Sequence, residues 1–403
     1  MQSNDTFRAH RHLIKDTMSP HFVYDVVGPA LHESTMDLVA LWKEKMRLAE
    51  GRPFNAEKDI IRNLVDVIIR VTFGYDLGAI EKQRRCISNL DKLNLPSNVD
   101  EPAIFPIAED PDAYTSVRTL VDSLHIAQNS PIPRQHLTFA LKFYPSLRAA
   151  WNWKNNMIRD RLDEAWRKFS QNADQDDKVK CATDLLVQRE VQMAKKDNRP
   201  PQYHTIAIRD ELFGIFAAGH ETTATTLCWS VKYLTEYPEV QRKLRAALRA
   251  THKRAAASGD VPSPPEILRT SVPYLDAFIE ELLRCCTTVP TVIRMATRDT
   301  VILGHHIPKG TDVLMLTNGP SYLSPAMLVD ESKRSKGSQD SKDRYGVWDD
   351  ADIRHFKPER WLVQEEKGNV TFNNRAGPGN PYGFGLRGCF GVFYLTEHLD
   401  GAN

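Results

Sequence analysis

Apolar positions in the first half of the chain recur at intervals of three and four residues, which is the period of amphipathic α-helices. Helices are expected over 31–46, after the Gly28-Pro29 break, over 55–74, and over 135–167. Connections, rich in polar residues or proline, are expected over 95–133 and 168–180.

The longest helical run is expected to extend from about Thr205 to Tyr237, where Pro238 ends it because proline cannot continue the hydrogen-bond pattern. At about 1.5 Å per residue this helix would span roughly 50 Å. Its centre, 212–218, is apolar on all sides and is therefore expected to be buried all round.

The last third of the chain is expected to contain short strands beside one further helix over 273–284. The apolar segments 301–303 and 313–316, separated by Pro308 and Gly310, are typical of strands. Loops are expected over 330–345 and 368–391. The whole pattern predicts a mainly α-helical fold with small β-sheets, formed as a single domain over 1–403.

The composition is that of a globular protein, with a mean hydropathy of −0.44. In the 403 residues, 53 lysines and arginines nearly cancel 52 aspartates and glutamates, so no net field favours nucleic acid. The six cysteines form no CxxC pair, which predicts reduced thiols. Because the sequence shows neither a signal peptide nor a run of roughly 20 apolar residues, the chain as written is expected to be soluble and cytoplasmic.

The sharpest chemical signal is a glycine-rich loop over 377–391 that surrounds one cysteine, Cys389. Glycines let the backbone adopt positive φ and approach a flat ligand closely. Backbone N–H groups at a helix start favour a thiolate, and Arg387 can neutralise a nearby anion. Thiolate is an axial ligand of haem iron, so the loop is a candidate metal site. The alternative is a surface loop with an incidental cysteine.

A second signal, the segment 218–223 (Ala-Gly-His-Glu-Thr-Thr), lies in the middle of the longest expected helix, where glycine and threonine are unfavourable. A glycine there opens a groove, and a threonine hydroxyl can bond to a carbonyl of the preceding turn. Glu221 and Thr222 could deliver protons to a bound oxygen species. The segment taken alone favours a packing notch of small residues, and His220 is expected to be a packing or solvated residue.

A third signal is the pair Glu281 and Arg284, spaced i, i+3 on one helix face. Such pairs are usually surface pairs that contribute a few tenths of a kcal/mol. Here the flanking residues are apolar, which favours a buried pair, and a buried pair needs further partners. Arg360, in the segment Pro-Glu-Arg-Trp over 358–361, is a candidate partner.

The order and spacing of these motifs resemble the cytochrome P450 superfamily of haem-thiolate monooxygenases. The family's loop pattern is FxxGxRxCxG, in which Gly385, Arg387, Cys389 and Gly391 match and Tyr382 replaces the phenylalanine. The resemblance implies haem b as the cofactor and Cys389 as the axial ligand of its iron. It also implies that Arg387, Gly385 and Tyr382 lie around the cofactor.

The resemblance assigns roles to residues outside the loop. Thr222 and Glu221 would be the oxygen-activating alcohol and acid, with Gly219 beside the haem. Arg294 and Arg11 would bind the haem propionates, although Phe7 stands where the family usually has tryptophan. Glu281, Arg284 and Arg360 would form a structural triad. Phe213, Phe216, Ala217, Val289, Val292 and Ile293 are expected to line a lipophilic pocket.

Compared with the family, the chain is expected to lack parts of the fold at both ends. It begins at what resembles the third helix, so the N-terminal helices and first strands would be missing. After Gly391 only 392–403 remain, in place of the haem-packing helix and a C-terminal sheet. The hypothesis is a fragment or an incomplete gene model, whose full-length parent would sit on the endoplasmic reticulum membrane.

The resemblance implies insertion of one oxygen atom from O₂ into a lipophilic organic substrate, in secondary metabolism by similarity to fungal members. Electrons would come from a separate NADPH-dependent reductase, because the sequence shows no dinucleotide fingerprint. Two alternatives remain open, a haem-thiolate isomerase or dehydratase that does not use O₂, and a truncated non-catalytic remnant. A candidate docking patch for the reductase consists of Arg242, Lys243, Arg245 and Arg254.

Overall fold

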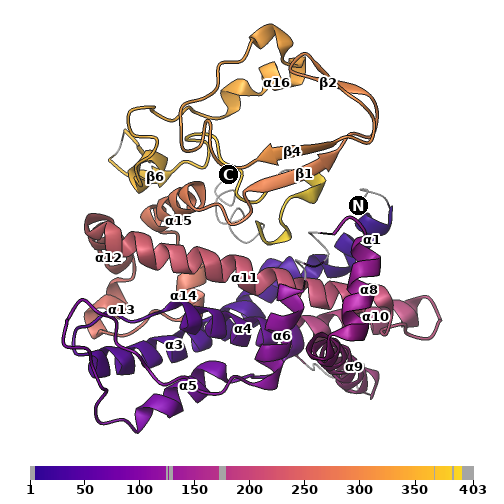
Figure 1. The fold of residues 1–403 in the computed structure, drawn as a ribbon, viewed down its shortest axis with the longest axis vertical. Coiled ribbons are helices and arrows are strands. Elements are labelled where there is room, and N and C mark those ends of the chain that lie inside the picture. The colour runs from indigo at the N-terminus through magenta and orange to yellow at the C-terminus, as the bar shows by residue number, and fades with distance from the viewer. Residues whose placement is uncertain are drawn as a thin grey trace. The chain divides into compact units, whose positions relative to one another are not determined.

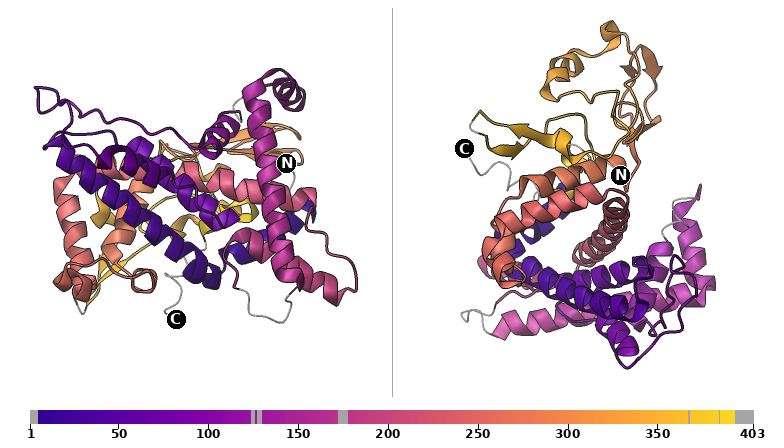
Figure 2. Two further views of the ribbon diagram at one scale, coloured as in Figure 1. Left: turned by 90° about the horizontal axis from the view of Figure 1, so that it is seen from below. Right: turned by 90° about the vertical axis from the view of Figure 1, so that its left-hand side faces the viewer.

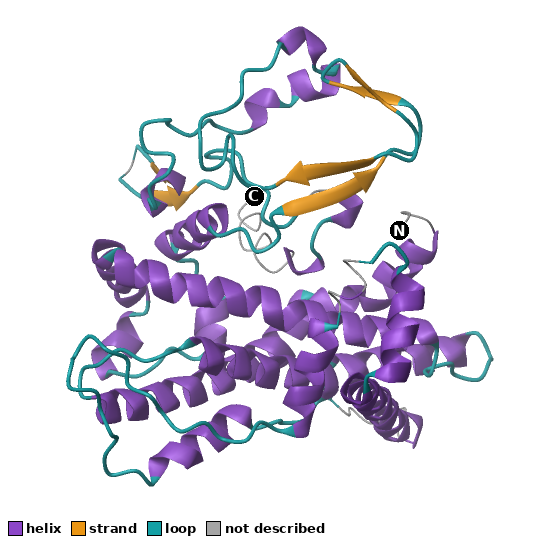
Figure 3. Cartoon of the chain, viewed as in Figure 1, coloured by secondary structure: helices purple, strands orange, loops and turns teal. Residues whose placement is uncertain are grey.

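The computed structural model describes residues 5–123, 126, 130–171, 178–366, 368–383 and 385–392 (Figure 1). Its contacts divide the chain into two compact units, an N-terminal unit of Met1–Ala224 and a C-terminal unit of Thr225–Asn403. The predicted single domain over 1–403 stays a prediction. Helices dominate and the sheets are small, which confirms the predicted fold class (Figure 3).

The centre of the N-terminal unit is formed by α3 (Gly28–Ala49), α4 (Glu57–Phe73) and α5 (Ala79–Ser88), which pack against one another (Figure 2). The helix predicted over 55–74 is confirmed as α4, and Gly74 ends it with a left-handed φ of +74°. α3 begins at Gly28 and includes Pro29, which is tolerated there because a helix's first N–H groups have no intrahelical partner. The core between α3 and α5 consists of Leu38, Leu41, Leu48, Ile80 and Ile87.

Two predicted segment boundaries in the N-terminal unit were wrong. The helix predicted over 135–167 is two helices, α8 (Pro133–Phe143) and α9 (Pro145–Gln171). They are separated at Tyr144, which is extended because the residue before a proline is disfavoured in helical conformation. The connection predicted over 95–133 contains α6 (Asp112–Asp122), whose buried Val117 and Leu120 lie one turn apart on its packed face.

The longest helix, α11 (Ile206–Glu236), confirms the prediction made from its apolar run and from Pro238. The prediction that its centre, 212–218, is buried on all sides was wrong. Leu212 and Phe216 are buried, whereas Gly214 and Ala218 on another face are exposed. The sequence is apolar on both faces, so its pattern alone could not distinguish them.

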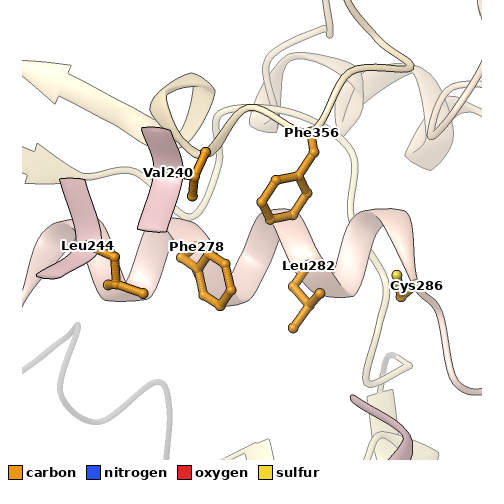
Figure 4. Packing of buried hydrophobic residues seen from close by; sticks show 6 residues of the cluster. All are labelled: Val240, Leu244, Phe278, Leu282, Cys286 and Phe356. Carbon is orange, nitrogen blue, oxygen red and sulfur yellow. The ribbon is translucent and has the colours of Figure 1, made fainter. Parts of the chain in front are cut away.

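The core of the C-terminal unit lies between α12 (Pro238–Thr251) and α15 (Pro273–Cys285), with Phe356 packed against both. The helix predicted over 273–284 is thereby confirmed as α15. Figure 4 shows the cluster, which consists of Val240, Leu244, Phe278, Leu282, Cys286 and Phe356.

Three antiparallel pairs of strands complete the C-terminal unit. The two predicted strands are confirmed, but each pairs with a short strand that the apolar pattern did not indicate. The pairs are β1 (Thr291–Met295) with β4 (Asp312–Leu316), β2 (Thr300–Ile302) with β3 (His305–Ile307), and β5 (Leu362–Gln364) with β6 (Val370–Phe372).

Apart from α10, the remaining elements are short. The segment predicted as a loop over 330–345 contains three short helical turns.

Within the residues that the structure describes, no helix is long and apolar enough to cross a membrane. The remaining elements are α1 (Asp5–Ile14), η1 (Lys15–Met18), α2 (Pro20–Phe22), η2 (Val23–Val27), α10 (Ala182–Lys196), α13 (Lys253–Ser258), α14 (Pro264–Leu268), η3 (Glu331–Lys333), α16 (Lys336–Asp340), η4 (Lys342–Arg344), η5 (Pro358–Trp361), η6 (Gly385–Arg387) and η7 (Phe390–Val392).

Candidate functional site

The cysteine loop of the C-terminal unit is closed by its own backbone. Gly383 and Gly385 have φ values of +70° and +68°, which a residue with a side chain rarely adopts. The Gly388 N–H donates to the Gly385 carbonyl at 2.9 Å, and the Cys389 N–H donates to the Tyr382 carbonyl at 2.7 Å. These two bonds and two glycines fix the backbone on which Cys389 is presented.

Cys389 differs from the other cysteines in its exposure. All six cysteines lie in the described part of the chain, and of these Cys389 is exposed while the others are buried or half-buried. Burial raises the pKa of Cys181 and of Cys285 to about 12, which keeps those thiols protonated. A Cβ at Gly391 would lie 3.8 Å from the Cys389 sulfur, which is an ordinary van der Waals distance. An accessible sulfur on a fixed loop fits the thiolate ligand of haem iron.

In the same unit, one carboxylate accepts hydrogen bonds from five donor groups. Glu281 is fully buried and accepts from Arg284 Nε at 2.8 Å and from Arg284 Nη2 at 2.7 Å. It also accepts from Arg360 Nε at 3.0 Å, from Trp361 Nε1 at 2.9 Å and from the Lys357 backbone N–H at 2.8 Å. The three residues that the sequence grouped are thus in direct contact, and two further donors join them.

The two arginines extend this cluster into the segment before η5. Arg284 Nη1 donates to the Ile353 carbonyl at 2.8 Å, and Arg360 Nη1 donates to Asp352 Oδ1 at 2.9 Å. Hydrogen bonds from Lys357 and Arg360 lower the pKa of Asp352 to about 2. The buried charges therefore hold α15 against 352–361, and sequence reasoning did not identify Asp352.

Trp348 links the cluster to the cysteine loop, and sequence reasoning missed it too. The guanidinium groups of Arg284 and Arg360 lie 5.7 and 5.5 Å from its ring centroid. Its indole N–H donates to the Pro378 carbonyl at 3.1 Å. A Cβ at Gly377 would overlap the same ring, so that position requires glycine. The signal in the sequence that could have indicated Trp348 is its position shortly before the segment 358–361.

Glu280, which neighbours Glu281 on α15, is a second acidic group that the sequence motifs did not indicate. It is half-buried, and its desolvation, with a smaller contribution from Asp276, raises its pKa to about 7. Burial also raises the pKa of Tyr382, to which the charges of Glu280 and Cys389 add. The tyrosine that replaces the family's phenylalanine is thus half-buried and under the influence of an acidic side chain of α15.

In the N-terminal unit, the 218–223 segment of α11 bonds back to its own preceding turn. Thr222 Oγ1 donates to the Ala218 carbonyl at 2.9 Å, and Thr223 Oγ1 donates to the Gly219 carbonyl at 3.1 Å. Glu221 and Thr222 are exposed. The two threonine hydroxyls behave as the sequence predicted, and Glu221 and Thr222 are accessible to a ligand.

Gly219 and His220 serve packing. A Cβ at Gly219 would lie 2.7 Å from Ile68 Cδ1, so glycine lets α4 approach α11 closely. His220 is buried, stacks on Phe216 with ring centroids 5.4 Å apart, and has Nδ1 at 3.1 Å from the Phe216 carbonyl. Phe216 itself is 2% exposed and packs near Phe73, and the expectation that it lines a pocket stays a prediction.

The remaining predicted residues lie on α1, on β1 and in η6. Arg11 is half-buried on α1, and its guanidinium lies 5.9 Å from the ring centroid of Phe7. Arg294 is exposed on β1, where its Nη1 donates to the Ile293 carbonyl at 3.0 Å. Arg387 is half-buried in η6 of the cysteine loop. The predicted site residues are therefore distributed over both units.

Comparison with known proteins identifies the family. The Cytochrome P450 family profile matches residues 1–321. Cytochrome P450 monooxygenase GME11363 of Pestalotiopsis microspora is 46% identical, over 97% of this chain and 68% of that protein. Cytochrome P450 monooxygenase TRI13 of Fusarium sporotrichioides is 37% identical, over 97% and 70%. The crystal structure of the cytochrome P450DA heme domain shares the fold, with a TM-score of 0.59 at 19% identity, over 97% of this chain and 68% of that one. The chain belongs to the cytochrome P450 family.

Proposed function

We propose that this chain is a haem-dependent monooxygenase that inserts one oxygen atom from O₂ into a lipophilic organic substrate of fungal secondary metabolism. Membership of the family implies a haem whose iron is held by a cysteine thiolate, and relatives of this chain are cytochrome P450 monooxygenases. The observation that carries the proposal is the exposed sulfur of Cys389 on a loop that its own backbone closes.

In this proposal the thiolate of Cys389 would hold the haem iron. Gly385 and Tyr382 shape the loop beside the cofactor, and Arg387, Arg294 and Arg11 neutralise its carboxylates. Bound haem iron supplies the activation of O₂ and the transfer of one oxygen atom. Glu281, Arg284 and Arg360 act at a distance, by holding the segment that leads to the cysteine loop. Gly219 keeps α11 close to α4.

Thr222 and Glu221 organise proton delivery. Inserting one oxygen atom of O₂ requires that the other leave as water, which consumes two electrons and two protons. Glu221 and Thr222 are both exposed and are consecutive residues of α11, and an acid and an alcohol can relay protons from solvent. A separate NADPH-dependent reductase supplies the electrons.

The first test is the absorption spectrum of the haem-loaded, reduced chain with carbon monoxide. A strongly red-shifted Soret band is expected for the wild type and for Cys86→Ser, a control at a half-buried cysteine. Cys389→Ser should lose the shift while retaining the fold. An ordinary Soret position in the wild type, or a red shift that survives Cys389→Ser, would overturn the assignment.

The second test separates oxygen insertion from the isomerase or dehydratase alternative. Turnover under ¹⁸O₂ should place one labelled oxygen atom in the product, and Thr222→Ala should reduce coupling of electron consumption to product. Product formed without label and without O₂ consumption would favour the alternative.

A further inference from the structure

The first helix, α1, is held in place by very little apolar packing. Of its ten residues, Ile14 alone is buried. A helix of that length is marginal in water by itself, and most helical stability in proteins comes from a buried apolar face. The position of α1 must therefore depend on polar contacts with helices that are better anchored.

One such contact comes from Arg189 of α10, a helix with several buried residues on its core side. Arg189 Nη1 donates to the carbonyls of His12 at 3.1 Å and Leu13 at 3.4 Å, and it lies 2.9 Å from Asp16 Oδ2. Its Nη2 lies 3.0 Å from His12 Nε2. The carbonyls at a helix's C-terminal end lack intrahelical partners and carry partial negative charge, so a guanidinium there both satisfies and stabilises them.

A second contact joins α1 to α11. His10 Nδ1 lies 2.7 Å from Glu211 Oε1, and both side chains are largely shielded from solvent, with 32% and 21% exposed. Glu211 lies on the same helix as Glu221 and Thr222, ten residues before the first of them. The middle of α1 is thus held by α11 and its C-terminal end by α10.

We infer that Arg189 and Glu211 are positioning residues that hold α1, and through it Arg11, in place for a carboxylate of the bound cofactor. The inference rests on the role proposed above for Arg11, which sits between the two tethered positions on α1. Neither residue is assigned contact with the cofactor. No sequence motif indicated either residue, because their partners are 176 and 201 positions away.

The expected consequence is faster loss of haem from the folded protein. Arg189→Gln should raise the rate of haem transfer to excess apomyoglobin roughly fivefold, as for loss of a partly shielded cation at a helix end. Glu211→Gln should raise it less, because glutamine still accepts a hydrogen bond from His10. Arg189→Lys should give a rate of haem transfer between those of the wild type and Arg189→Gln. Its ammonium group keeps the positive charge but lacks the forked donors of the guanidinium. Arg199→Gln is the matched control, because Arg199 forms a comparably exposed ion pair with Glu190.

Two readouts distinguish positioning from general destabilisation. Hydrogen exchange in the haem-loaded chain should rise over 5–14 in Arg189→Gln, and not in Arg199→Gln. In a double-mutant cycle, Arg11→Ala with Arg189→Gln should lose haem no faster than Arg11→Ala alone, because Arg189 acts through Arg11. Effects that multiply in the double variant would overturn the inference.

The outcomes also separate this inference from the proposed function. If Arg11→Ala accelerates haem loss and Arg189→Gln does not, the positioning role is overturned and the proposed function stands. If Arg11→Ala has no effect, the cofactor role of Arg11 and the positioning inference both fall, whereas the Cys389 spectrum still tests the thiolate assignment independently.

Discussion

Replacing Glu281 with glutamine removes the negative charge on which two buried guanidinium groups depend. The side chains of Arg284 and Arg360 are 1% and 6% exposed, and the Glu281 carboxylate that faces them is fully buried. Glutamine has nearly the same volume, but it offers one acceptor oxygen and presents an NH₂ group, itself a donor, to the surrounding donors. Several of the five hydrogen bonds onto Glu281 are therefore lost together with the charge.

Breaking a buried ion pair by removing one partner costs about 3–5 kcal/mol. Domains are typically stable by only about 5–15 kcal/mol, so Glu281→Gln should remove roughly a fifth or more of the free energy of unfolding. The assay is urea unfolding at pH 8 followed by tryptophan fluorescence, since Trp348 and Trp361 lie within the cluster. Changes in midpoint at constant slope report stability.

Glu280→Gln is the matched control, because it is the same substitution one residue away on the same helix. Burial raises the pKa of Glu280 from its usual 4.5 to about 7. A raised carboxyl pKa means that the folded state binds the proton more tightly, so stability falls as pH rises from about 4.5 through about 7. At pH 8 glutamine removes that penalty, and the variant should be neutral or more stable by up to about 2 kcal/mol. If the two variants unfold within about 1 kcal/mol of each other, the reasoning about the buried charge is wrong.

Three further predictions concern single positions. The pKa of Asp352 is lowered from 3.8 to about 2, so its carboxylate stabilises the fold fully above about pH 4 and less as the pH falls toward 2. Asp352→Asn should therefore make the free energy of unfolding less dependent on pH between pH 2 and 5, as unfolding curves can measure. Gly377→Ala should lower the melting temperature by several degrees, because its Cβ overlaps a rigid indole ring, whereas Gly379→Ala should be tolerated; equal losses would contradict this. Gly219→Ala should cost about 1 kcal/mol by displacing the tip of Ile68, and Ile68→Val should recover most of it, as a thermal double-mutant cycle can measure.

The helices that the sequence predicted well are those whose boundaries are local signals. α4 ends at a glycine in the left-handed region, and α11 ends just before a proline. The division between α8 and α9 was missed because the apolar period continues across Tyr144, while the break depends on the proline that follows. Strand partners were missed because pairing joins residues that are distant in sequence, and a run such as His305–Ile307 has no apolar alternation of its own.

The same division between local and distant signals applies to the candidate site. Cys389, Glu281 and Arg284 could be identified because their motifs are short and their order along the chain is distinctive. Arg189 and Asp352 could not, since a single arginine or aspartate on the surface of a helical protein carries no pattern. Their importance comes from what the fold places beside them, namely the end of α1 and the guanidinium of Arg360.

Trp348 shows why the buried acid cluster and the cysteine loop, far apart in the sequence, depend on one another in the C-terminal unit. The indole ring lies near two guanidinium groups whose charge Glu281 balances, and its N–H donates to the Pro378 carbonyl at the start of the loop. Gly377 lies against the same ring, so the backbone there has little room to move. If the charges beside the ring lose their counterion, the ring and the first residues of the loop must shift together. Glu281→Gln should therefore disturb the thiolate spectrum of Cys389, although Glu281 is assigned no contact with the cofactor.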